Sequence, residues 1–252
     1  MKNKFLSLLC ISTISVGMFA GTDLLPVKGR GKSSPKMFIG LSVGAGLPMG
    51  NFGKSTKQAV NDSTVQGYAK TGIYFNLSAG YKLSNLIGVM IQLGGNLNGF
   101  NSVAYDANAN NPAGTTVGTS HYIGSYLVGP YLGIPVGDKL SVNVRVLGGL
   151  MTDKFSSVTS TLSPGSALQQ TFNHQYAPAM TFGYDAGAGL TVHATERIGI
   201  ALNVDYLGGT PTFTKSTETY TGPLISTVGT RTDKWPLSVG IVNVSLGLVV
   251  RF

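Results

Sequence analysis

The amino-acid sequence predicts an all-β protein, a closed antiparallel barrel of eight strands that crosses a membrane. Three observations favour this fold class. Apolar residues alternate with small or polar ones along eight segments, which is the period of a strand with two different faces. Charged residues are 11% of the chain, whereas soluble domains carry about 25%. The connections between segments alternate between long and short, as in transmembrane β-barrels.

The amino terminus, residues 1–20, has the pattern of a secretory signal peptide. Lys2 and Lys4 make a basic start, and an uncharged apolar stretch follows as far as Phe19. This stretch is shorter than the roughly 20 residues that a spanning helix needs, so we favour cleavage over a retained anchor. The single cysteine, Cys10, would leave with the signal, and the remaining chain would form no disulfide.

Residues 21–36 form a basic segment, which we interpret as a periplasmic linker before the first strand. Its cations stand among glycine, serine and proline, and they are Lys28, Arg30, Lys32 and Lys36. A short basic stretch without aromatic residues is not typical of nucleic-acid binding, so we expect no nucleic-acid partner. Anionic lipid head groups are the alternative partner for these charges.

Residues 37–252 are expected to form the barrel. The predicted strands, in order, are 37–47, 71–83, 87–98, 120–134, 139–151, 179–193, 197–209 and 235–252. In each strand the apolar face suits lipid, and the small or polar face suits the inside of a barrel. Pro130 lies within the fourth strand, where its missing N–H suggests a β-bulge.

The connections indicate which end of the barrel faces outward. The long ones are 48–70, 99–119, 152–178 and 210–234, and the tight turns are 84–86, 135–138 and 194–196. Four long extracellular loops and three short periplasmic turns are the arrangement of outer-membrane barrels. The loops are rich in Asn, Thr, Ser and Gly, which predicts mobile, hydrated surfaces without a defined pocket. A soluble lipocalin-like barrel is the rival, but neither strand face carries the charge that its exterior would need.

Four inward-facing polar residues are predicted to meet near mid-height, on consecutive strands: Arg145, Asp185, Asp205 and Asn243. The interior of an eight-stranded barrel is only just wide enough for side chains. Because unpaired charges are costly there, we expect these groups to pair and to close the lumen as a polar network. The alternative is a small gated path lined by the same charges.

The sequence contains no strong catalytic or metal-binding pattern. His121, His174 and His193 lack an acid and a hydroxyl at a spacing that strands would bring together, so we expect rim and loop histidines and no enzyme. No acidic cluster has calcium-loop spacing and no cysteine–histidine set could hold zinc, so no metal or cofactor is expected. Aromatic residues near strand ends are expected to form interfacial girdles: Phe38, Tyr74, Phe75, Tyr81, Tyr122, Tyr126, Tyr206 and Trp235.

The chain after the signal resembles the small outer-membrane β-barrel proteins of Gram-negative bacteria, the OmpA/OmpX-like eight-stranded class. The resemblance rests on the signal, the alternating strands, the loop rhythm and the terminal Phe252. In that class a terminal aromatic residue is recognised by the barrel-assembly machinery, so the resemblance implies this role for Phe252. We expect no second domain after the barrel, so the resemblance is not expected to extend to peptidoglycan tethering.

These observations predict a monomeric outer-membrane barrel that is not an enzyme and has a structural or surface-interaction role, such as membrane integrity, adhesion or loop-mediated binding. The expected partners are outer-membrane lipids and lipopolysaccharide, together with the assembly machinery during insertion. The main alternative is a small passive channel for ions or small solutes. The third is an enzyme that modifies outer-leaflet lipid.

Overall fold

The computed structural model of the chain describes residues 35–55, 66–108, 115–223, 226–232 and 234–252. The predicted signal peptide and all of the predicted linker except its last two residues lie outside the described residues. Within the described part of the chain, no helix combines the length and the hydropathy that a membrane-crossing helix requires.

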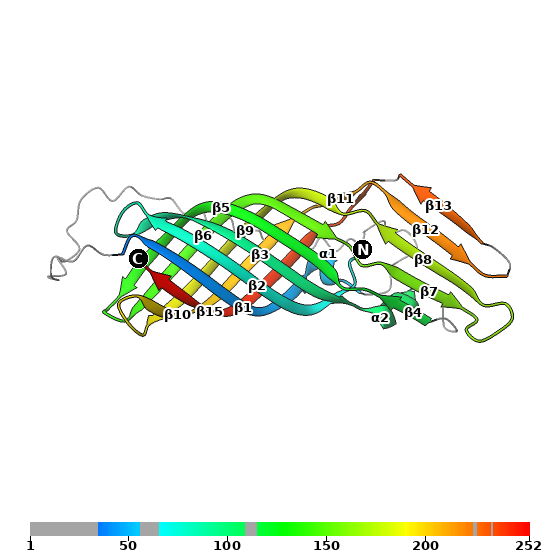
Figure 1. The fold of residues 1–252 in the computed structure, drawn as a ribbon, viewed down its shortest axis with the longest axis horizontal. Coiled ribbons are helices and arrows are strands. Elements are labelled where there is room, and N and C mark those ends of the chain that lie inside the picture. Colours follow the sequence, from blue (N-terminus) through cyan, green and yellow to red (C-terminus); the bar gives the residue numbers. More distant parts are fainter. Residues whose placement is uncertain (1–34, 56–65, 109–114, 224–225, 233) are drawn as a thin grey trace, which may run out of the picture. The chain divides into compact units, whose positions relative to one another are not determined.

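The eight predicted strands are present and close into one antiparallel barrel (Figure 1). They are β1 (Met37–Met49), β2 (Ala69–Lys82), β3 (Ile87–Phe100), β5 (His121–Val136), β6 (Leu140–Lys154), β9 (Ala179–His193), β10 (Ile198–Gly209) and β15 (Val239–Arg251). The order around the barrel is β1-β15-β10-β9-β6-β5-β3-β2. The first and last strands close it, with unbroken pairing from Phe38–Arg251 to Met49–Gly240. The predicted fold class is therefore confirmed.

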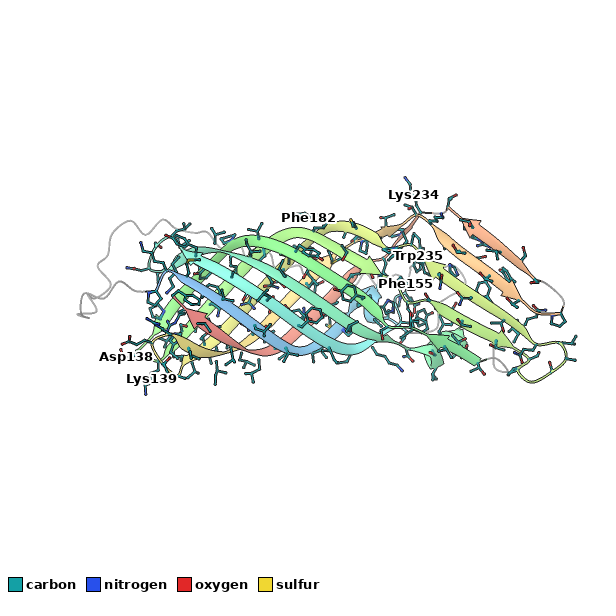
Figure 2. All side chains as sticks on the ribbon, in the orientation of Figure 1. Asp138, Lys139, Phe155, Phe182, Lys234 and Trp235 are labelled. Atoms are coloured by element: carbon teal, nitrogen blue, oxygen red, sulfur yellow. The ribbon has the colours of Figure 1, made fainter. Side chains whose placement is uncertain are left out.

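The barrel has two different surfaces because side chains alternate along each strand. Outward positions of the strands between the two rims carry aliphatic and aromatic side chains and no charge, and Phe182, which is 70% exposed, projects from the wall (Figure 2). The turn end of the barrel carries Asp138 and Lys139 (Figure 2). An uncharged apolar exterior of this kind matches lipid and would be unstable in water.

Pro130 does not cause the predicted bulge. The pairs Val128–Gly148 and Tyr131–Arg145 keep one register on both sides of it, although the pairing of β5 with β6 is interrupted between them. Pro130 is exposed on the outer face, and its missing donor therefore removes a ladder bond without displacing the strand. The described register shift in the barrel wall lies instead between Ala69 and Gly72 of β2.

The prediction of aromatic girdles is right for part of the set. Phe75, Tyr81, Tyr122, Tyr126 and Tyr206 are exposed on the outer surface. The prediction is wrong for Phe38, Tyr74 and Trp235. Tyr74 is only 1% exposed and Phe38 packs edge-to-face on Tyr131, 5.4 Å between ring centroids, so both lie inside the barrel. Trp235 stacks on Tyr176 in the extracellular part of the chain.

The composition of the long connections predicted mobile, hydrated surfaces, but their described segments form regular strands. They build a five-stranded sheet in the order β13-β12-β8-β7-β4 and a two-stranded sheet of β11 with β14, beyond the loop end of the barrel (Figure 1). These strands are β4 (Thr115–Gly118), β7 (Val158–Leu162), β8 (Gln170–Tyr176), β11 (Thr212–Phe213), β12 (Ser216–Thr221), β13 (Thr227–Arg231) and β14 (Trp235–Pro236). Two short helices, α1 (Gly50–Gly53) and α2 (Ser102–Asn108), complete the described elements. The threonines and aromatic residues of these segments favour strands as well as loops, and composition alone did not separate the two.

Candidate functional site

The lumen is filled from the loop end by a cluster of buried apolar side chains. Phe52 of α1, Ile123 of β5, Met151 of β6 and Leu237 are each 0% exposed within this cluster. Its other loop-side members are Ala69, Leu127, Leu147, Phe155, Ala179, Leu207, Phe213, Val239 and Ile241. These side chains pack against one another inside the loop end of the barrel.

His121 packs against this cluster. It is 0% exposed, and its ring packs edge-to-face on Phe155 at 4.6 Å and on Phe52 at 5.2 Å between centroids. The backbone N–H of Ser156 donates to His121 Nδ1 at 3.3 Å. Because Nδ1 is the acceptor, the N–H proton of the neutral imidazole is on Nε2. His121 is therefore a core residue of the loop end and is not accessible as a base.

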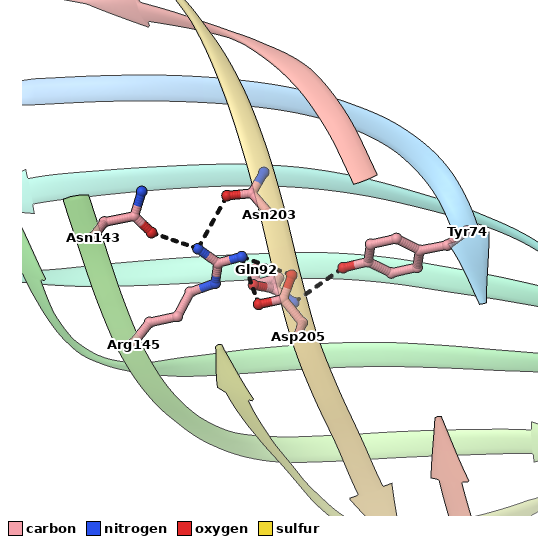
Figure 3. A network of polar contacts seen from close by, with 6 residues as sticks. All are labelled: Tyr74, Gln92, Asn143, Arg145, Asn203 and Asp205. Carbon is pink, nitrogen blue, oxygen red and sulfur yellow. Dashed lines mark hydrogen bonds and ion pairs between the residues drawn. The ribbon is translucent and has the colours of Figure 1, made fainter. Parts of the chain in front are cut away.

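A group of polar side chains, which we call the polar layer, meets inside the barrel (Figure 3). Nη2 of Arg145 lies 2.5 Å and 2.7 Å from the two carboxylate oxygens of Asp205. Nη1 of Arg145 donates to Oδ1 of Asn143 at 2.7 Å and to Oδ1 of Asn203 at 3.3 Å. Both charged side chains are almost completely buried, with 4% and 0% exposure. This buried ion pair links β6 with β10 across β9 and is held by amides on the same two strands.

Glycines on β9 allow this ion pair to form. Arg145 on β6 and Asp205 on β10 both pair with Gly187, which lies between them in the sheet. A Cβ atom at Gly187 would overlap the carboxylate of Asp205. Gly189 stands in the same way between the amides of Asn143 and Asn203. Because these two positions of β9 have no side chain, the side chains of β6 and β10 can reach one another across β9.

The structure places the other predicted lumen residues close to this pair. Asp185 is 1% exposed and interacts electrostatically with both Asp205 and Arg145. Asn243 is 1% exposed and lies opposite Asp205 in the β10–β15 ladder. Among the described residues, neither side-chain polar atom of Asn243 has a hydrogen-bond partner.

Sequence reasoning missed further members of the polar layer. Nε2 of Gln92 donates to the hydroxyl of Tyr74 at 3.3 Å, and both side chains are 1% exposed inside the barrel (Figure 3). The signal for Tyr74 was present, because it has the same strand parity as Gly72 and Asn76. Asn143 and Asn203 also carry the inward parity, but only the register shows that they flank Arg145.

Two of the described histidines, His174 and His193, have polar neighbours that the sequence did not predict. His174 of β8 lies 3.8 Å from the carboxylate of Glu218, which Arg231 also contacts at 3.3 Å. His193 Nε2 lies 3.1 Å from the hydroxyl of Ser141. The sequence suggested neither pairing. Within the described residues, however, no histidine has both an acid and a hydroxyl in contact, and no group of three metal-ligating side chains is found.

Acidification is expected to loosen the extracellular sheet around His174. Burial lowers the pKa of His174, and Arg231 lowers it further, while Glu218 partly opposes them. Because the folded pKa lies below the unfolded value of about 6.5, folding disfavours the proton, and this contribution to stability is lost as the pH falls below about 6.5. Hydrogen exchange of the β8 and β12 amides should therefore be faster at pH 5 than at pH 7, after correction for intrinsic rates. The same difference in His174→Gln would contradict this assignment.

Comparison with known proteins gives similarity in fold and little in sequence. No family model matches the chain, and no curated protein matches it. Among solved structures, it is similar to Ail, the attachment invasion locus protein of Yersinia pestis, with 16% identity over 86% of this chain and 99% of that chain, and a TM-score of 0.40. Neisserial surface protein A (NspA) has 12% identity over 86% and 97%, with a TM-score of 0.42. The outer-membrane protease OmpT from Escherichia coli has 8% identity over 89% and 99%, with a TM-score of 0.49.

The class of protein follows from the chain's own architecture. Eight antiparallel strands close without an edge, the exterior is apolar, and the interior is filled by polar and apolar side chains. Such a structure satisfies every requirement of a membrane-spanning strand protein. The protein is an integral outer-membrane β-barrel of the small eight-stranded class, and its particular role is proposed below.

Proposed function

We propose that this protein is a closed outer-membrane scaffold that displays a folded extracellular sheet for contact with other surfaces. The filling of its lumen is the observation that carries this proposal. The apolar cluster at the loop end and the Arg145–Asp205 pair support a closed lumen, because both occupy the interior of a narrow barrel with buried, packed side chains. Function is then expected at the ends of the barrel.

The extracellular sheet supports a role in contact. All residues of β13, Thr227–Arg231, are exposed, and this strand pairs only with β12 within the described sheet. An edge strand of this kind presents free backbone donors and acceptors to which another chain can pair. Stacked rings connect the sheet to the barrel, because Tyr176 of β8 lies 4.7 Å from Trp235, which lies 5.0 Å from Phe155. The sheet is thus continuous with the apolar cluster at the loop end of the barrel.

Single-channel recording in a planar bilayer tests the closed lumen. We expect no discrete current steps from the folded barrel, with heat-modifiable migration on a gel as proof of insertion. Steps in the unmodified protein that change size when Asp205 is replaced by asparagine would instead establish the small channel.

Adhesion of cells that display the protein is measured in parallel. Deletion of Thr227–Arg231 should reduce adhesion without changing the amount of inserted barrel. Equal adhesion would remove β13 from the contact surface. We expect the mass of lipid A to be the same before and after incubation with the protein. A changed mass would instead support an enzyme that modifies lipid.

Phe252 is expected to act in assembly and not in the stability of the finished barrel. Its ring is 63% exposed, while its backbone exchanges hydrogen bonds with Met37, N–O distances 3.2 Å and 2.9 Å. Phe252→Ala keeps these backbone bonds, so refolding in detergent should be unchanged, whereas the amount of barrel assembled in cells should fall. Phe182→Ala, which removes an outward aromatic ring of similar exposure, is the control. An equal loss of assembly in both variants would contradict a specific signal at Phe252.

A further inference from the structure

The part of the lumen near the turn end contains a cavity of about 170 Å³, which we call the vestibule. It reaches from Arg145 of the polar layer to residues at the turn ends of three strands, Lys82, His193 and Arg251. The turn end faces the periplasm in an outer-membrane barrel, so the vestibule would be reached from that side, and Arg145 of the polar layer forms part of its lining away from the turns.

The charge of the vestibule has one sign. Its lining includes Arg145, Lys82, Arg251 and His193, and no aspartate or glutamate side chain among the described residues. Asp205 balances Arg145, but Lys82 and Arg251 have no carboxylate partner within the described chain. Lys82 and Arg251 repel one another, and both act on His193. A recess with low-dielectric walls and one sign of charge concentrates ions of the opposite sign.

Buried donors at both ends of the vestibule point to the same kind of ligand. Nε of Arg145 is buried in a side chain that is 4% exposed, and no described group accepts its hydrogen bond. Nε of Arg251 is also buried without an acceptor among the described residues. A buried donor is costly when it is unsatisfied, and guanidinium groups pair most strongly with carboxylate and phosphate oxygens. The lining therefore contains two buried guanidinium donors for which no described residue supplies an acceptor.

The vestibule also has an apolar part to its lining. Phe38 of β1 and Tyr131 of β5 form an edge-to-face pair there, and Met90 of β3 lies beside them in the lining. The sheet order places Lys82 of β2 and Arg251 of β15 on either side of β1, and Phe38 of β1 lies directly opposite Arg251 in the ladder, so the apolar rings lie next to these cations. An inorganic ion would contact only the cations. A ligand with an anionic group and an apolar body would contact both the cations and the rings.

We infer that the vestibule binds a small organic anion from the periplasmic side. Its carboxylate or phosphate group lies between Lys82 and Arg251, and its apolar body packs against Phe38 and Tyr131. This inference goes beyond the scaffold role, because it assigns a binding site to the opposite end of the barrel from the extracellular sheet. It also does not depend on that role, since a closed lumen and a conducting one would both contain the vestibule.

Fluorine NMR of the detergent-solubilised barrel, purified from cell envelopes, tests the site with 4-fluorobenzoate as the probe. We expect saturable binding of 4-fluorobenzoate above the signal of empty micelles, and weaker binding of the neutral amide 4-fluorobenzamide. Lys82→Gln and Arg251→Gln should each raise the Kd about tenfold, the equivalent of one lost charge-assisted contact. Lys139→Gln removes an exposed cation at the same end of the barrel, outside the vestibule lining, and should leave the Kd unchanged.

Three results would overturn the inference: no saturable binding of 4-fluorobenzoate, equal binding of the amide, or an equal rise in Kd in Lys139→Gln. Heat-modifiable migration of each variant shows that its barrel is folded. If Arg251→Gln assembles poorly, because it adjoins the terminal residue, Lys82→Gln decides the outcome. Current recording on the same samples separates this inference from the scaffold proposal, because binding without conductance supports both and binding with conductance supports the vestibule alone.

Discussion

Replacement of Arg145 by methionine is expected to lower the free energy of unfolding of the barrel by about 3–5 kcal/mol, the typical cost of removing one partner of a buried ion pair. Methionine keeps much of the side-chain volume but leaves Asp205 and Asp185 buried without the cation that both of them interact with. Urea unfolding in detergent or lipid vesicles, followed by tryptophan fluorescence or gel migration, measures the change. Asn143→Ala removes one hydrogen bond to the same guanidinium and should cost about 1 kcal/mol.

A double variant makes this prediction specific to the ion pair. Arg145→Met combined with Asp205→Leu replaces both charges by apolar groups, which is often nearly neutral in a protein interior. The double variant should therefore be more stable than the sum of the single effects predicts, since the two side chains are in direct contact. Equal midpoints for Arg145→Met and Asn143→Ala, or strictly additive effects in the double variant, would show that the pair does not hold the lumen.

Replacement of Gly187 by alanine is expected to destabilise the barrel by about 3 kcal/mol or more. The added methyl group would overlap the carboxylate of Asp205 and come close to the carbonyl oxygen of Val204. Overpacking a closed interior costs about 1–3 kcal/mol, and displacement of Asp205 from Arg145 adds part of the cost of a broken buried pair. A methyl group at this position therefore acts on the ion pair from the strand between its two partners.

The control for Gly187→Ala is Gly133→Ala, another inward position of the barrel. A Cβ atom at Gly133 would meet only Tyr131, at an ordinary contact distance of 3.6 Å, so this variant should unfold within about 0.5 kcal/mol of the native protein. In an Asp205→Ala background the cost of Gly187→Ala should shrink, because the group it overlaps is gone. An unchanged cost in that background would place the strain elsewhere in the wall.

Strand parity was readable from the sequence for most of the barrel. The alternation along Met37–Met49 and Val239–Arg251 is strict enough to separate the lipid face from the lumen face, and the same alternation places Arg145 and Asp205 inward. Where the prediction departed from parity it was wrong, as for Phe38 and Tyr74. Both were assigned to interfacial girdles from their aromatic character, although their neighbours two positions along are small or polar lumen residues.

The contacts between strands could not be read in the same way. Arg145 meets Asp205 across Gly187 only because of the register of β6 with β9 and the register of β9 with β10. Both registers are linked to the closure of the whole barrel. The extracellular sheet joins β4, β7, β8, β12 and β13 from three different loops, and such pairing between distant segments leaves little local signal. The vestibule likewise exists only because Lys82, His193 and Arg251 end three strands that the barrel brings around one space.

The sequence by itself therefore determined the class of fold, the orientation of the strands and the face on which each residue lies, because these follow from a period of two and from loop length. The tertiary structure alone decided which inward residues meet, which loop segments pair, and where the lumen is filled or left open. The physical reason is that alternation is a property of each strand, whereas register and closure are properties of all eight strands together.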